Sequence, residues 1–140
     1  MVRVFVVAVG MLALLAACAE PPTRNPSQQE RSAKDAASQA DWQARVSAGR
    51  LPVGWRERVD RMLADRLNDP GSRRILEMRN PSGGLVCGRV NARNGFGGYG
   101  QPMFYYVLFG PDAQPTQSYL AGSGGGSAVD SIRAIHVCFR

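Results

Sequence analysis

The spacing of apolar residues along the chain changes near residue 70. Before that point, large apolar side chains recur every three or four positions, at Trp55, Val59, Met62, Leu63 and Leu67. This spacing predicts an amphipathic α-helix, which the Asp-Pro-Gly sequence at 69–71 ends. The other face of the helix carries acids and bases four positions apart, and such pairs stabilise a solvent-exposed helix face.

Beyond residue 70 the chain consists of short β-branched or aromatic runs separated by glycine, and these predict strands at 73–78, 85–90, 103–109 and 132–139. The Asn94-Gly95 pair between the second and third runs is typical of a hairpin. The last run also fits a helix, so that alternative stays open. Its helical face would comprise Val129, Ile132, Ile135 and Phe139. The sequence therefore predicts an α+β domain, with one amphipathic helix packed on a small antiparallel sheet.

The N-terminus has the layout of a secretory signal. Residues 1–3 form a short basic start, and residues 4–17 form an apolar run interrupted only by Gly10. A run of about 14 residues is shorter than the roughly 20 that a transmembrane helix needs. We therefore expect a signal peptide at 1–17 rather than a permanent membrane span.

Residues 15–18 read Leu-Ala-Ala-Cys and resemble the bacterial lipobox. The resemblance implies cleavage before Cys18 and lipidation of its thiol, which would anchor the mature chain in a membrane. Ala19 stands where an Asp would retain an enteric lipoprotein at the inner membrane, so we expect the periplasmic face of the outer membrane. Ordinary cleavage after Ala19 remains an alternative, because Ala17 and Ala19 form a small-x-small site.

Residues 18–50 are rich in Pro, Ser, Ala, Gln and charge, with few large apolar groups. Such a segment buries too little surface to offset its ordering entropy, and it predicts a flexible tether ahead of a domain at 51–140. A transient helix at 33–46 and docking of Trp42 on the domain are alternatives within this segment.

Two cysteines remain beyond the lipidation site. In an exported domain, Cys87 and Cys138 in separate apolar segments predict a disulfide. A redox-active pair is disfavoured because they are not spaced Cys-x-x-Cys, and a metal site is disfavoured because His136 is the sole histidine. We expect no metal and no cofactor.

The formal net charge of +6 favours anionic partners in general, although an exported protein rarely meets nucleic acid, and we expect none. No nucleophile, base and orienting group stand in a recognisable pattern, and His136 lies in an apolar run. No isolated carboxylate pair indicates glycoside hydrolysis. We therefore assign no catalytic residue. A cell-wall-acting enzyme with groups assembled from distant positions stays an alternative.

The glycines at 95–100 literally match G-x-G-x-x-G, but no helix can begin at the following Gln101-Pro102. No acidic residue follows at the spacing that a dinucleotide site requires. We interpret the segment as a glycine-rich hairpin loop that displays Phe96 and Tyr99.

Two stretches together resemble a family of small exported proteobacterial proteins, many of them lipoproteins. Residues 67–72 match L-x-D-P-x-S, and residues 86–99 match V-C-G-x-V-N-A-x-N-x-F-G-G-Y. Arg89 stands where an acid is usual in that pattern, and Gln101-Pro102 also departs from it, which leaves the charge of any shared surface in doubt. The resemblance supports the domain boundary and the disulfide, and it implies no activity.

If the glycine-rich loop binds a partner, the candidate surface comprises Asn91, Arg93, Asn94, Phe96 and Tyr99. Exposed aromatic rings beside Arg and Asn side chains suit a glycan or a protein. The purely structural alternative is that Asn and Gly form the turn while the two rings cover the sheet edge or core. The leading hypothesis is a non-enzymatic envelope lipoprotein that binds an envelope protein or glycan. An inhibitor of host or competitor hydrolases is the main rival.

Overall fold

The computed structural model describes residues 25–123 and 125–140; the expected signal peptide and Cys18 lie outside this part. The elements are α1 (Pro26–Ala48), α2 (Trp55–Ala64), the 3₁₀ turn η1 (Pro70–Ser72), β1 (Arg74–Ser82), β2 (Leu85–Asn91), β3 (Met103–Phe109), β4 (Pro115–Leu120) and α3 (Ala128–Cys138). The chain divides between Asp35 and Ala36 into two compact units, of which the second holds the sheet. In the first, the described residues form the start of α1, where the Asn25 side chain accepts a hydrogen bond from the Ser27 N–H.

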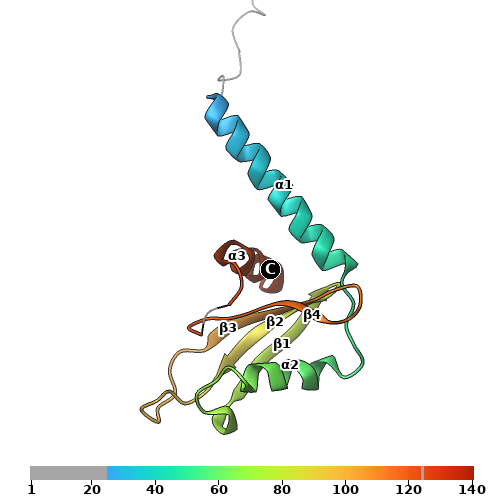
Figure 1. Ribbon diagram of the computed structural model, residues 1–140. Coiled ribbons are helices and arrows are strands. Elements are labelled where there is room, and N and C mark those ends of the chain that lie inside the picture. Colours follow the sequence, from blue (N-terminus) through green and yellow to red (C-terminus); the bar gives the residue numbers. More distant parts are fainter. Residues whose placement is uncertain (1–24, 124) are drawn as a thin grey trace, which may run out of the picture. The chain divides into compact units, whose positions relative to one another are not determined.

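The sheet has the order β1-β2-β3-β4, and every neighbouring pair is antiparallel. Helix α2 covers one face and α3 the other (Figure 1). Because alternate side chains of a strand point to opposite faces, Tyr105 and Val107 of β3 join the core under α2, whereas Tyr106 and Leu108 join the core under α3. The predicted α+β class and antiparallel sheet are thus confirmed.

The amphipathic stripe predicted for α2 faces the sheet, and Val59 and Leu63 are fully buried there. The helix ends at Ala64 rather than at the Asp-Pro-Gly sequence, and the chain turns before forming η1. Leu67 still packs against the same core from the turn. The apolar spacing therefore predicted correctly which face of the helix packs on the sheet, but it placed the end of the helix about one turn too late.

The tether expected to reach Arg50 is a helix that enters the core. Trp42 and Val46 are buried against Leu85, Tyr106 and Leu108 on the α3 side of the sheet. The Val46 carbonyl also accepts a hydrogen bond from the Gly84 N–H at 3.0 Å. The packed unit therefore begins at Ala36, and not at the expected boundary of Leu51.

The C-terminal segment expected at 132–139 as a strand is the helix α3, the alternative that the sequence left open. The Ser127 hydroxyl caps it by accepting from the Asp130 N–H at 3.4 Å. The buried residues of α3 are small or polar, among them Ala134 and Cys138, whereas Val129, Ile132 and Ile135 are 41–57% exposed. Phe139, just after the helix, is 39% exposed and packs edge-on against Phe104 of β3, with the ring centres 5.8 Å apart. Small side chains let the helix approach the sheet closely.

The predicted disulfide joins α3 to the sheet. Cys87 of β2 and Cys138 of α3 are bonded, with their Cα atoms 6.4 Å apart, and both are buried. The carboxylate of Asp130, at the other end of α3, is also buried. It accepts from Arg133 at 3.1 Å and from Gln117 of β4 at 3.1 Å, so both ends of the helix are held.

The fourth strand, β4, lies at 115–120, where the sequence reads Pro-Thr-Gln-Ser-Tyr-Leu and offers no apolar run. It pairs with β3 from Pro115 to Leu120. A strand that begins with proline and carries polar side chains suits a sheet edge, because proline cannot donate to a partner strand. Among residues 25–123 and 125–140, no helix is both long enough and apolar enough to cross a membrane.

The other edge strand, β1, is irregular. Its pairing with β2 shifts between Ile75 and Glu77, and again between Arg79 and Ser82. At the first shift the Tyr105 hydroxyl crosses β2 over Gly88 and donates to the Glu77 carbonyl at 3.0 Å. A Cβ at Gly88 would collide with that carbonyl. Burial raises the pKa of Tyr105 well above its usual range, which keeps the hydroxyl protonated as a donor.

Candidate functional site

The loop between β2 and β3 ends in a small turn that its own hydrogen bonds close. The Asn94 N–H donates to the Gly98 carbonyl at 2.8 Å, and the Asn94 side-chain oxygen accepts from the N–H groups of Phe96 and Gly98 at 3.0 and 3.1 Å. Gly97, rather than the Asn94-Gly95 pair, takes the positive φ of 81°. Phe96 lies in this turn with its side chain 100% exposed. The turn therefore fixes the backbone of a residue that packs on nothing.

Tyr99 has a different role from Phe96. Its hydroxyl donates to the Ser72 carbonyl at 2.9 Å, and the Ser72 hydroxyl accepts from the Arg93 N–H at 2.8 Å. The Arg74 guanidinium lies 4.3 Å from the centre of the Tyr99 ring, within the range of a cation–π contact. Tyr99 therefore fastens the loop to η1 and remains 38% exposed, whereas Phe96 is fully exposed, so both rings reach solvent as the sequence interpretation expected.

The bonds at Ser72 bring together the two stretches on which the family resemblance depends, residues 67–72 and 86–99. The first stretch is itself held in place, because the Asp69 side chain accepts from the Ser72 N–H at 3.3 Å. Next to it, Arg73 donates to Asp60 of α2 at 2.7 Å, and this bond lowers the pKa of Asp60. The loop thus rests on a turn that is tied to a core helix.

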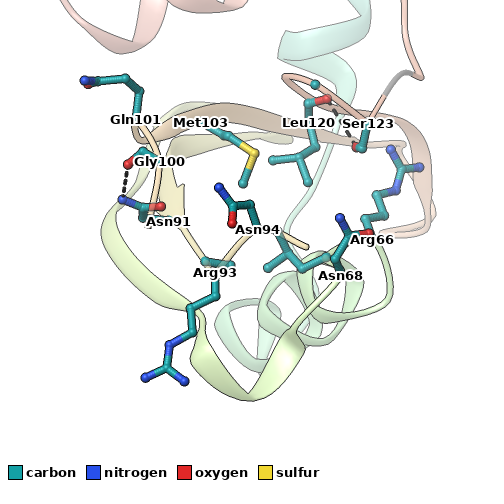
Figure 2. Close-up of a pocket in the computed structure, with 13 residues that line it drawn as sticks. Arg66, Asn68, Asn91, Arg93, Asn94, Gly100, Gln101, Met103, Leu120 and Ser123 are labelled. Atoms are coloured by element: carbon teal, nitrogen blue, oxygen red, sulfur yellow. Dashed lines mark hydrogen bonds between the residues drawn. The ribbon is translucent and has the colours of Figure 1, made fainter. Parts of the chain in front are cut away.

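A pocket of about 300 Å³ opens beside the loop, at the end of the sheet where β2 ends, β3 begins and β4 ends. Its apolar lining comes from Leu67, Met103 and Leu120. Its polar lining comes from Arg66, Asn68, Asn91, Arg93, Asn94, Gln101 and Ser123 (Figure 2). The lining contains no acidic residue, so the pocket is unsuited to a cation.

The structure brings three of the five predicted surface residues to this pocket, namely Asn91, Arg93 and Asn94. The Asn91 amide donates to the Gly100 carbonyl at 2.9 Å, and the Arg93 side chain extends away from the other labelled residues (Figure 2). Phe96 and Tyr99 do not line the pocket. The five predicted residues therefore have three roles. Asn91, Arg93 and Asn94 line the pocket, while Phe96 is exposed and Tyr99 is bonded to η1.

Sequence reasoning missed the opposite wall, formed by Arg66, Asn68 and Ser123. Arg66 is held there by a hydrogen bond from its guanidinium to the Ser118 hydroxyl of β4 at 2.7 Å. Arg66 and Asn68 belong to the turn after α2, and Ser123 belongs to the turn after β4. Because β4 has no apolar run, no local pattern could place them beside the loop.

His136 lies on the exposed face of α3, one turn from Ile132 and next to Ile135. Within the part of the chain that the structure describes, no three His, Cys, Asp or Glu side chains are grouped closely enough to hold a metal ion. Comparisons of the chain with protein-family models, curated proteins and solved structures give no match. The functional proposal therefore depends on the geometry of the loop and the pocket.

Proposed function

We propose that the chain is an exported lipoprotein, anchored through Cys18 to the periplasmic face of the outer membrane, whose α+β domain binds another envelope component, a protein or a glycan. The observation that carries the binding role is the fully exposed ring of Phe96 on a turn closed by hydrogen bonds. Because the backbone of the turn is already ordered, binding through this ring orders only one side chain. No nucleic acid, metal or cofactor enters this proposal.

The anchoring part of the proposal predicts a lipid on Cys18. Intact mass spectrometry of the natural protein should find a chain that begins at Cys18 and carries the mass of its acyl groups, because several chains on one residue bind a membrane stably. The Cys18→Ser variant should move from the membrane fraction to the soluble fraction. A natural chain that begins unmodified at Glu20 would contradict the anchor.

The binding part predicts that Phe96→Ser weakens partner capture at least about tenfold, as loss of a central aromatic contact does. The measurement is quantitative cross-linking of the tagged full-length protein in intact cells. Val53→Ser is the matched control, because Val53 is equally exposed and precedes α2, outside the pocket lining. Equal capture by wild type and Phe96→Ser would rule out the loop as the binding element.

A hydrolase inhibitor is the second candidate, favoured by the same closed turn, since a rigid loop can insert into an active-site cleft without loss of order. Lysozyme and protease inhibition assays distinguish the two. Inhibition that disappears in Phe96→Ser would support the inhibitor. Capture of an envelope component without inhibition supports the binding role.

A further inference from the structure

Two asparagine side chains in the pocket are each oriented by hydrogen bonds to only one of the two polar atoms of the side-chain amide. Asn91 uses its Nδ2 group to donate to the Gly100 carbonyl, and Asn94 uses its Oδ1 atom to accept from the Phe96 and Gly98 N–H groups. Among the described residues, no hydrogen bond engages Asn91 Oδ1 or Asn94 Nδ2. The pocket therefore offers one oriented acceptor and one oriented donor.

A secondary amide matches this pair, because it has one N–H to donate and one carbonyl to accept. A hydroxyl, which donates one hydrogen bond and accepts others, can also pair with both groups. A carboxylate only accepts hydrogen bonds, so it would leave Asn91 Oδ1 unpaired, and an ammonium ion only donates, so it would leave Asn94 Nδ2 unpaired. The hydrogen-bonding groups thus favour a neutral ligand that both donates and accepts, an amide or a hydroxyl, and the apolar lining distinguishes the two.

The remaining lining indicates what the amide is attached to. Figure 2 shows the Asn94 amide on the side of Met103, which with Leu120 supplies an apolar surface for a methyl group. Around this surface, Asn68 and Ser123 add side chains that can pair with hydroxyl groups. An amide with a methyl on one side and a hydroxyl-bearing ring on the other is an N-acetylated amino sugar.

We infer that this pocket binds the acetamido group of an N-acetylated glycan, with Asn91 Oδ1 accepting from the amide N–H and Asn94 Nδ2 donating to the acetyl carbonyl. The inference rests on the binding role proposed above and names a ligand class for the pocket beside the Phe96 turn, to which Asn94 belongs. The acetyl methyl lies against Met103 and Leu120.

Two neutral trisaccharides test the ligand class on the wild-type full chain in detergent. Triacetylchitotriose carries the acetamido group and cellotriose lacks it. Triacetylchitotriose should bind at least about tenfold more tightly, because cellotriose lacks both the methyl group that lies against Met103 and Leu120 and the amide that pairs with the two asparagine groups. In saturation-transfer NMR, the acetyl methyl protons should receive the strongest transfer. Equal affinity for the two sugars, or binding of neither, would overturn the inference.

Asn94→Asp tests the geometry. An aspartate retains the oxygen that accepts from Phe96 and Gly98 and replaces only the Nδ2 donor, so the turn should keep its shape while triacetylchitotriose affinity falls about tenfold or more. Asn25→Asp is the matched control, since it makes the same charge change at an exposed position in the other unit. Unchanged affinity in a folded Asn94→Asp protein would contradict the assignment.

An N-acetylated dipeptide amide provides the third comparison. Tighter binding of this peptide than of triacetylchitotriose would overturn the glycan assignment in favour of a peptide. Failure of the glycan inference is distinguishable from failure of the binding role, because capture that depends on Phe96 is measured separately. If the protein binds none of the sugars but Phe96→Ser still reduces partner capture, the glycan inference fails and the proposed binding function stands.

Discussion

Replacing Cys87 and Cys138 together by alanine should lower the free energy of unfolding by about 4 kcal/mol, which is the loop-closure entropy of a cross-link between residues 51 apart. The disulfide is the covalent link between α3 and the sheet. Alanine avoids leaving a polar group in the sites, since both cysteines are buried. Urea denaturation of the oxidised proteins gives the measurement.

The control is the same titration after reduction. Dithiothreitol should destabilise the wild type by a similar amount and leave the double variant unchanged, because the variant has no bond to lose. Each single alanine variant should show nearly the full loss, so that the two substitutions are not additive. A double variant within about 1 kcal/mol of the oxidised wild type would show that the cross-link constrains little.

Trp42→Ala should lower the free energy of unfolding by about 3–5 kcal/mol, as removal of a fully buried aromatic side chain does. Trp42→Phe should have a much smaller effect. The indole Nε1 has no hydrogen-bond partner among the described residues, so its removal breaks no bond while most of the apolar contact remains. Thermal or urea unfolding measures both variants.

Gln43→Ala is the control for the helix itself, because this neighbouring side chain is exposed and its loss should change stability by less than about 0.5 kcal/mol. The comparison decides where the folded unit begins. If Trp42→Ala is as harmless as Gln43→Ala, residues 36–48 lie outside the cooperative core, and the boundary expected at Leu51 is the better one.

The elements that sequence analysis predicted are those whose pattern is local. The stripe from Trp55 to Leu67 predicted α2, and β-branched or aromatic runs predicted β1, β2 and β3, the last with its observed bounds of Met103–Phe109. Residues 36–48 lacked such a pattern, because Trp42 and Val46 are their two buried residues. Their burial depends on Leu85 and Tyr106, which are distant in the sequence.

The two errors in the C-terminal half have a common cause. Strand β4 is a polar edge strand whose order comes from pairing with β3, and polar sequence alone does not predict such pairing. Without it, the final apolar run was the remaining candidate for a fourth strand. The cap at Ser127 and the burial of small residues such as Ala134 instead place that run in a helix.

The candidate site was predictable on one side only. Asn91, Arg93 and Asn94 were identified because turn chemistry and a family resemblance both point to that loop. The fastening of Tyr99 to Ser72 and the wall carrying Arg66 are tertiary contacts between segments that no local pattern connects. The different roles of Phe96 and Tyr99 are therefore visible in the structure and could not be predicted from the sequence.

The irregular pairing of β1 affects how readily copies of the protein can associate edge to edge. Lipid-anchored chains would share a two-dimensional surface at high density, where the open margin of a sheet is a template for another chain. The shifts at Ile75/Glu77 and Arg79/Ser82 interrupt that margin, and Pro115 removes a donor from the opposite one. Crowded copies of this protein should therefore resist growing into a shared, fibre-like sheet.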